Sequence, residues 1–436
     1  MSHEDDPVHR VRCPVHGFIK LSERERRIVD HPLLQRLRHV RQLSLACYVF
    51  PGAMHSRLEH SLGALEVASR IFDQLALRSP DLLRRALDAS SELGGAPLSH
   101  ARALVRLAGL IHDVGHAAFS HGAQAVLCPD GHERLTAWAL RSTDLGDAVD
   151  RHYGSGSAVI VARLALGEFR GTPLAPLQDI VAGVLDADRT DYLLRDSLHC
   201  GVEYGRFDHR RLIECLELAP TDAGPRLALA RDGLHAFEAM ILARHQMTTQ
   251  VYQHRVRRIY DRYLAEYLRT HHPDGPPSPG EVLAGHDVGW LARILDDARD
   301  PSTARGRWAA RIAARRHHRR VFETGKYATN AEVSRARAMV DALAARHPEL
   351  ELVYDEPSSE LHDLAPHGEG ASLRLTGGGR PAGEVVDESP ILRAIPRRCR
   401  CARIYADVRD GDTEGARAWR PGLTEEARGL WVELGG

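Results

Sequence analysis

The stretch LAGLIHDVGHAAFSH at residues 107–121 decides the fold. Residues 104–111 are mostly apolar and predict a helix that is buried on most of its sides. Four side chains that bind metals or transfer protons follow at its end: His112, Asp113, His116 and His121. Imidazoles and carboxylates suit a borderline divalent metal such as manganese, iron or zinc. One histidine alone would be interpreted as a cap or a core residue, but this grouping favours a metal site.

The composition is that of an ordinary globular protein. The 436 residues are enough for two or three domains, and 43% of them are hydrophobic. The net charge of -1 excludes a globally basic nucleic-acid binder, although not a local basic patch. Seven scattered cysteines indicate a reducing compartment. The N-terminus is polar and acidic and no apolar run reaches membrane-spanning length, so we expect a cytoplasmic protein without a membrane partner.

The chain before this stretch contains several element signals. Residues 16–21 (HGFIKL) predict a short strand, and Ser22 stands three residues before Glu25, which is a capping-box spacing for the next helix. Pro32 should open a further helix that extends over residues 33–43.

Two further segments carry histidine. His60 lies early in a helix that is expected to reach about Leu75. His132 and Glu133 open another helix, where they form either a proton-relay pair or a charged helix cap. Their spacing favours neither interpretation.

Residues 180–202 (IVAGVLDADRTDYLLRDSLHCGV) are mostly helical and unusually acidic within an apolar frame. Buried carboxylates are rare unless they are paired or bind a metal, so Asp188 and Asp191 are candidates for a site. The alternative is a helix held by ion pairs with Arg189 and Arg195.

The C-terminal part is less informative. Residues 233–269 predict one long helix, and DGPPSPG at 274–280 is the clearest linker. We therefore expect a helical core over residues 1–272, a linker over 273–280, and a helical extension with a small α+β lobe over 281–436. The basic stretch at 305–320 is compatible with nucleic-acid binding, but a solvated helix face is favoured.

Six segments together resemble the HD-domain family, in particular the deoxynucleoside triphosphate triphosphohydrolases whose mammalian member carries a sterile alpha motif. They are HGFIKL, QRLRHVRQL, YVFPGAMHSRLEHSLG, LAGLIHDVGHAAFSH, DADRTDYLLRD and YQHRV, in the family's order. The resemblance runs from about Val11 to His272. It implies an all-α HD-domain fold, which agrees with the helical patterns, and no sterile alpha motif fits before Val11.

The resemblance also implies a reaction. The ligands of a divalent ion (manganese, iron, zinc or magnesium) would be His60, His112, Asp113 and Asp188. The neighbouring catalytic group would be His116, His121, His132 and Glu133. In the family, a metal-activated water attacks the α-phosphate of a dNTP and releases a deoxynucleoside and inorganic triphosphate.

Further positions match the family's substrate pocket. The triphosphate would be held by Arg57, Arg189, Tyr192 and Arg244. The sugar would be held by Gln42, Leu43, Asp196 and Tyr252, of which the leucine and the second tyrosine would exclude a 2′-hydroxyl. Two positions differ from the mammalian member: Arg189 replaces a lysine, and Gln124 replaces an acidic residue that would raise the basicity of His121.

The mammalian relative is also activated by nucleotides. The matching positions for a guanine-nucleotide activator are Asp30, Gln35 and Arg38, and those for a second nucleotide between subunits are Arg211, Arg231, His254 and Arg255. These matches imply a homo-oligomer, either a dimer or a tetramer. The alternative is that Asp30 only caps the helix that begins at Pro32 and pairs with Arg38.

Two other functions remain open from the sequence. The first is another HD phosphohydrolase, acting as a nucleotidase or phosphodiesterase; members that cleave cyclic dinucleotides typically have a lysine where this chain has His116. The second is a nucleic-acid-binding protein that uses residues 305–320 and has a degenerate metal site.

Overall fold

The computed structural model describes residues 7–222, 224–362, 364, 373–378, 382–407 and 414–435. The chain forms two compact units. The first unit contains Met1–Met247, His272–Ala292 and Asp363–Ile395, and the second contains Thr248–His271, Arg293–His362 and Pro396–Gly436. Both are discontinuous in sequence, whereas we expected contiguous domains on either side of residues 273–280. Compactness does not identify which segments fold independently, so those domain boundaries stay a prediction.

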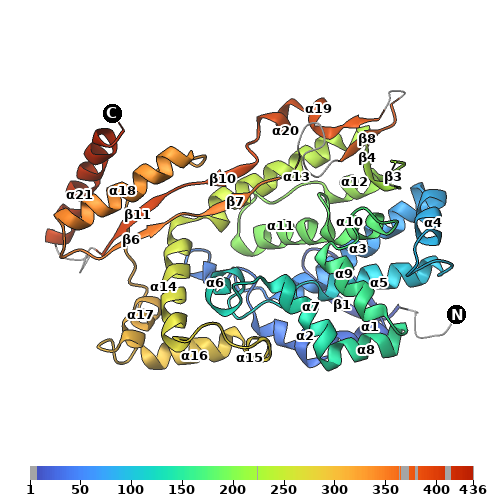
Figure 1. Ribbon diagram of the computed structural model, residues 1–436, viewed down its shortest axis with the longest axis horizontal. Helices are drawn as coiled ribbons and strands as arrows, with labels where there is room; N and C mark the ends of the chain where they lie inside the picture. The colour runs from blue at the N-terminus through green and yellow to red at the C-terminus, as the bar shows by residue number, and fades with distance from the viewer. Residues whose placement is uncertain are drawn as a thin grey trace. The chain divides into compact units, whose positions relative to one another are not determined.

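The first unit is built mainly of helices (Figure 1). They are α1 (Glu23–Val29), α2 (Pro32–Arg36), α3 (Arg57–Arg78), α4 (Pro80–Asp88), α5 (Leu98–Ile111), α6 (Gln124–Leu127), α7 (His132–Ser142), α8 (Asp144–Tyr153), α9 (Ser157–Leu166), α10 (Ala175–Ala182), α11 (Ala187–Cys200), α12 (His209–Glu214), α13 (Leu234–Met247), α15 (Pro279–Ala284), α19 (Val385–Glu388) and α20 (Pro390–Ala394). Helix α16 (Asp287–Asp297) begins in this unit.

Three helices form the centre of this unit. Helix α3 packs against α5 and α11, and two glycines on the facing surfaces allow a close approach. A Cβ at Gly109 would lie 3.0 Å from the carbonyl oxygen of Ala64, and a Cβ at Gly63 would collide with the side chains of Asp191 and Arg195. Residues 104–111 are buried at every position, as expected for the core helix. The close packing brings the ends of α3, α5 and α11 to one place.

Several expected elements are confirmed. The strand expected at residues 16–21 is β2 (Gly17–Ser22), which pairs antiparallel with β1 (Pro7–Cys13). Ser22 and Glu25 form a capping box at the start of α1, and Pro32 is the first residue of α2. Both signals are local, so the sequence is sufficient to locate them.

Two expected helices are wrong in extent. The helix expected over residues 33–43 ends early: α2 is followed only by a 3₁₀ turn at Leu37–His39. The backbone beyond it pairs instead with the segment before α3, where Gln42 N donates to His55 O at 3.1 Å. The single helix expected over residues 233–269 is α13, a π turn at Thr248–Tyr252 and then α14 (Arg255–His271).

The sheets are small, and in the first unit β3 (Leu216–Ala219) packs against the central helix α3. In this unit, β3, β4 (Arg226–Ala230), β8 (Arg374–Thr376) and β9 (Gly383–Glu384) form a sheet in that order. The described part of the second unit contains α14, α17 (Ala304–Ala313), α18 (Asn330–Arg346) and α21 (Glu414–Glu433), with sheets of order β5-β11-β6 and β10-β7. These strands are β5 (Arg319–Glu323), β6 (Leu352–Asp355), β7 (Ser358–Glu360), β10 (Arg398–Arg400) and β11 (Arg403–Ala406).

This arrangement confirms a helical core with a small α+β lobe toward the C-terminus. Helices α18 and α21 pack against the lobe's three-stranded sheet through a cluster that includes Met339, Leu343, Ile404 and Leu430. Among the described residues, no helix combines the length and the apolar character that a membrane span requires.

Candidate active site

The four predicted metal ligands lie together at the helix ends. His60 is in the first turns of α3, His112 caps the C-terminus of α5 and Asp113 follows it, and Asp188 is in the first turn of α11. The His60 Nε2 atom is 3.0 Å from Asp188 Oδ1 and 3.5 Å from Asp113 Oδ2. His112 Nε2 is 3.3 Å from Asp113 Oδ1. Only Asp188 has a substantially exposed side chain, at 36%, so the group opens to solvent on that side.

Both imidazoles present Nε2 to the centre of this group. His60 Nδ1 pairs with Asp191 Oδ2 at 2.8 Å, and His112 Nδ1 pairs with the carbonyl oxygen of Gly109 at 2.8 Å. A neutral imidazole has one N–H, so a donating Nδ1 leaves a lone pair on each Nε2, and these two atoms are 3.3 Å apart. Two lone pairs that face each other beside two carboxylates repel one another, so a positive charge at the centre of this group would stabilise it. The residues therefore fit a divalent cation.

The ionisation behaviour agrees with this fit. Burial alone would lower the pKa of His60, but its hydrogen bonds to Asp188 and Asp191 outweigh burial and raise that pKa to about 10. Burial likewise opposes ionisation of Asp113, yet the Arg57 guanidinium and His112 hold the pKa of this carboxyl well below its usual range. The carboxylates thus stabilise positive charge at the point that both Nε2 atoms face, and a bound divalent cation would supply this charge in place of a proton, since ligation requires the neutral imidazole.

Asp191 orients His60, and the sequence analysis did not assign it this role. Its carboxylate accepts hydrogen bonds from His60, from His16 Nε2 at 2.6 Å and from Arg195 Nε and Nη2, each at 2.8 Å. The three-residue spacing from Asp188 places Asp191 on an adjacent face of α11 and was visible in the sequence. The contact to His16 crosses 175 positions, and no local signal predicts it.

The second histidine group lies beside the first. The rings of His116 and His132 stack with centroids 3.6 Å apart, and the His121 ring is 4.8 Å from that of His116. His116 Nε2 is 3.3 Å from Asp113 Oδ1, which joins the two groups. His121 Nδ1 pairs with Gln124 Oε1 at 2.9 Å, and Glu133 Oε2 is 3.4 Å from His132 Nδ1. Burial lowers the pKa of His132 to about 3 and that of His116 well below its usual range.

The four predicted phosphate-binding residues belong to the first unit. Arg57 is buried, donates to Asp113, and donates from Nε to Ser120 Oγ at 2.6 Å. Arg189 follows Asp188 on α11 and pairs with the helix cap Asp186 at 2.6 Å. Arg189 and Arg244 both act electrostatically on Tyr192, whose pKa burial raises. Arg57 thus contacts a predicted metal ligand, Arg189 follows another in sequence, and Arg244 lies close enough to Tyr192 to act on it electrostatically.

Three of the predicted sugar-binding residues are buried in the first unit. Asp196 Oδ1 pairs with His55 Nε2 at 2.7 Å, and the His55 ring stacks on His199 at 4.4 Å. Gln42 is 8% exposed, and its Oε1 atom has no hydrogen-bond partner within the described chain. Leu43 lies next to it, also buried. Tyr252 belongs to the second unit, in the π turn between α13 and α14.

The predicted activator residues are dispersed. Asp30 is exposed at the end of α1 and pairs with Arg26 at 2.5 Å, while Arg38 Nε donates to Gln35 Oε1 at 2.6 Å. The cap of α2 is His31, so the alternative in which Asp30 caps that helix is wrong.

The remaining activator residues lie in both units. Arg231 pairs with Glu388 at 2.6 Å and Arg211 with Asp232 at 3.5 Å, all in the first unit. His254 and Arg255 belong to the second unit.

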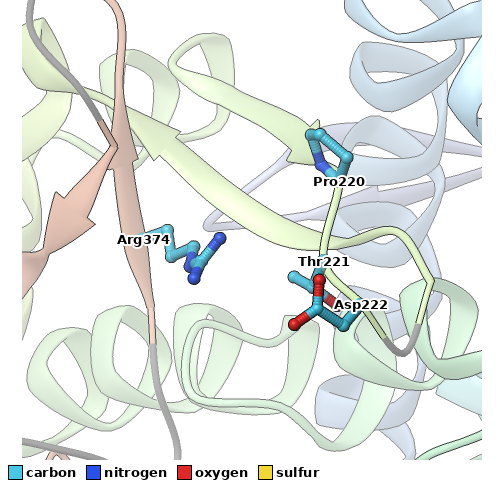
Figure 2. A pocket seen from close by; sticks show the side chains of 4 residues that line it. All are labelled: Pro220, Thr221, Asp222 and Arg374. Atoms are coloured by element: carbon cyan, nitrogen blue, oxygen red, sulfur yellow. The ribbon is translucent and has the colours of Figure 1, made fainter.

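Two other features lie outside this site. His318, Glu351 and Asp407 offer ligand atoms within 4.8 Å of one another, but Arg311 already bridges the two carboxylates. This pairing also neutralises part of the basic stretch at 305–320. A pocket of about 470 Å³ is lined by Pro220, Thr221, Asp222 and Arg374 (Figure 2), and none of these is a predicted site residue.

Two family models match parts of this chain. The model of the HD domain matches residues 57–195, which include all four predicted metal ligands, and the model of an HD-associated region matches residues 207–352. An uncharacterised protein of Methanocaldococcus jannaschii is 32% identical over 251 residues, or 58% of this chain and 47% of the relative. Human deoxynucleoside triphosphate triphosphohydrolase SAMHD1 is 27% identical over 291 residues, or 60% of this chain and 44% of the relative. The chain spans about half the length of the curated relatives it matches.

Solved structures show the same fold. A hypothetical protein from Aquifex aeolicus matches with a TM-score of 0.74 and 26% identity, over 97% of this chain and 99% of that one. A phosphohydrolase from Bacteroides thetaiotaomicron matches with a TM-score of 0.69 and 21% identity, over 91% of this chain and 99% of that one. The chain therefore contains an HD domain, and the four predicted metal ligands lie within the residues that match it.

Proposed function

We propose that this protein is a metal-dependent dNTP triphosphohydrolase that releases a deoxynucleoside and inorganic triphosphate. The observation that carries the proposal is the group formed by His60, His112, Asp113 and Asp188, in which two Nε2 lone pairs and two carboxylates face one point. Similarity to SAMHD1 supports the choice of substrate class. A bound divalent ion would lower the pKa of water and offset charge at phosphorus.

Arginines supply the charge that a triphosphate requires. Arg57 contacts Asp113, Arg189 follows Asp188, and Arg244 acts on Tyr192, so these three are proposed to supply positive charge to the opening beside Asp188. A guanidinium can bind phosphate oxygens with two parallel hydrogen bonds. Because Arg57 is buried and bonded to Asp113, it also fixes this carboxylate. We assign these residues and Tyr192 to triphosphate binding.

His121 is the proposed proton donor to the leaving 5′ oxygen. It is exposed, and Gln124 orients its ring without adding the charge that an acidic residue would supply. His116 and His132 are buried and their pKa values are lowered, so both are neutral near pH 7 and cannot donate as imidazolium ions. We assign them, with Glu133, to positioning and proton acceptance.

The proposed sugar pocket contains Asp196 and Gln42. The buried Oε1 of Gln42 needs a hydrogen-bond donor, and a sugar hydroxyl can provide one. Leu43 and Tyr252 are proposed, from the family resemblance, to exclude a 2′-hydroxyl. Equal turnover of GTP and dGTP would contradict this exclusion and leave a general nucleotide hydrolase.

The first prediction tests the reaction itself. Each dNTP is incubated with the protein and a panel of divalent metals, and chromatography should show deoxynucleoside and triphosphate rather than pyrophosphate or phosphate. Asp113→Ala should lose both metal and turnover, because one of four ligands is removed. Asp81→Ala, an exposed carboxylate in the first turn of α4, is the control and should retain both. Full metal occupancy and turnover in Asp113→Ala would refute the assignment.

The second prediction concerns activation by guanine nucleotides in a homo-oligomer. Two carboxylate oxygens can accept from the N1 and amine hydrogens of guanine, and Asp30 is exposed at the end of α1, where a guanine would have to compete with Arg26 for it. Added GTP should raise the mass toward a tetramer. Turnover should show a lag or a sigmoidal dependence on nucleotide concentration, and added GTP should remove it. Asp30→Ala should abolish the activation and leave bound metal unchanged. Hyperbolic dATP kinetics at constant mass would rule it out.

A further inference from the structure

A segment that follows the HD domain is bonded to the loop that carries the catalytic histidines. Asp287, at the start of α16, is 1% exposed and lies in the HD-associated region, in the same compact unit as this loop. Its Oδ1 accepts from the backbone N–H of Phe119 at 2.7 Å, and its Oδ2 accepts from the backbone N–H of Arg41 at 3.0 Å. One carboxylate therefore joins two loops that both reach the site.

The loop needs an external restraint. Phe119 and Ser120 have φ values of 59° and 50°, in the left-handed region that residues other than glycine seldom adopt. Each such residue is strained and persists only where its surroundings hold it. The two strained positions lie between His116 and His121, so their conformation sets where His121 stands.

The restraint continues to the predicted metal ligands. Ser120 Oγ donates to the carbonyl oxygen of Arg41 at 2.6 Å and accepts from Arg57 Nε at 2.6 Å. Arg57 in turn donates to Asp113. A hydrogen-bonded path thus runs from Asp287 through the strained loop to the proposed phosphate-binding arginine.

Arg36 fixes the other side of the same segment. This buried guanidinium donates to the carbonyl oxygens of Gly285 at 2.9 Å, Val114 at 2.8 Å and His116 at 2.7 Å. Asp287 supplies acceptors for loop N–H groups, and Arg36 supplies donors for loop carbonyls. Burial raises the pKa of Asp287 to about 6, although the hydrogen bonds from the two backbone N–H groups lower it. The buried carboxylate is therefore costly to keep charged, and its hold on the loop is a reason for its presence there.

We propose that Asp287 is a positioning residue that holds the loop 114–121 and thereby places His121 and Arg57 for the reaction. It touches no reacting atom and no predicted metal ligand. The HD-associated region then completes the HD domain's active site instead of only following it. The role in turnover rests on the proposed function, whereas the hold on the loop does not.

The test compares Asp287→Asn and Asp287→Ala with Asp296→Asn, a control on the same helix whose side chain is 74% exposed. In Asp287→Asn the shape is kept, but an amide N–H₂ must face one of the two backbone donors. Both Asp287 variants should retain metal content, because Asp287 touches no predicted ligand. The kcat should fall about tenfold or more, because His121 acts in the transition state, and the rise in KM from displacement of Arg57 should be smaller. A purely structural role would lower the unfolding midpoint and leave kcat per folded molecule unchanged, which would overturn the proposal.

Amide hydrogen exchange gives a readout without turnover. In Asp287→Ala, peptides that cover residues 112–121 should exchange at least tenfold faster, whereas those that cover α9 should not change. Unchanged exchange at Phe119 and Arg41 would overturn the proposal even if activity fell. If the unmodified protein hydrolysed no dNTP, the proposed function would fail, and the exchange result would still decide whether Asp287 holds the loop.

Discussion

At the scale of single residues, the orientation of His60 depends on Asp191. This carboxylate is fully buried, and although burial raises its pKa, Arg195, His16 and His60 hold that pKa well below its usual range. Asp191→Asn replaces one accepting oxygen by a donor that must face another donor. We expect metal affinity to fall 10- to 100-fold, as for other carboxylates that orient a ligating histidine, with partial recovery of activity at high metal concentration.

Asp179→Asn is the matched control for this change. Asp179 is also buried and also receives two hydrogen bonds from an arginine, Arg226, each at 3.0 Å, but it touches none of the predicted ligands. Metal titration of both variants, with circular dichroism to verify folding, separates orientation of His60 from general stability. Equal metal affinity in the Asp191 variant and the unmodified protein would show that His60 needs no such support.

At the scale of elements, the sequence predicts what local signals encode. The buried helix before His112, the capping box at Ser22 and the proline at the start of α2 are all set by residues within one or two turns. His112 and Asp113 are candidates for the same reason, whereas the complete ligand set with His60 and Asp188 is implied only by the family resemblance. Local patterns cannot predict the close approach of α3 to α11 at Gly63. This approach depends on the side chains of Asp191 and Arg195, which belong to α11.

The two expected helices that are interrupted, over residues 33–43 and 233–269, depend instead on contacts that are not local. Residues 33–43 have an apolar helical pattern, but the chain leaves the helix after His39 because Val40 and Gln42 bond to the backbone of Arg57 and His55. In the expected helix over 233–269, Gln253 N–H bonds to Thr248 O, five residues back. Its amide side chain then reaches Ser359 and Cys399. In both places, partners distant in sequence outweigh helix propensity.

At the scale of the whole molecule, buried histidines whose pKa is lowered should make stability fall in acid. His318 is the clearest case: it is 1% exposed, and burial lowers its pKa to about 4 from its ordinary value of 6.5. Between these values the unfolded chain binds a proton that the folded chain does not. Stability is therefore present above the unfolded pKa and is lost as the pH falls from about 6.5 toward 4.

The size of this effect can be measured by comparison of two pH values. For His318 alone, the free energy of unfolding should fall by about 2 kcal/mol between pH 7.5 and pH 5.0. His318→Gln loses the bond to Tyr263 at both pH values, so its overall stability drops, but its pH dependence should be smaller by that amount. His235→Gln, at a side chain that is 92% exposed, should keep the dependence of the unmodified protein. Urea unfolding at both pH values measures the difference, and an equal acid loss in His318→Gln would mean that His318 is already protonated in the folded state.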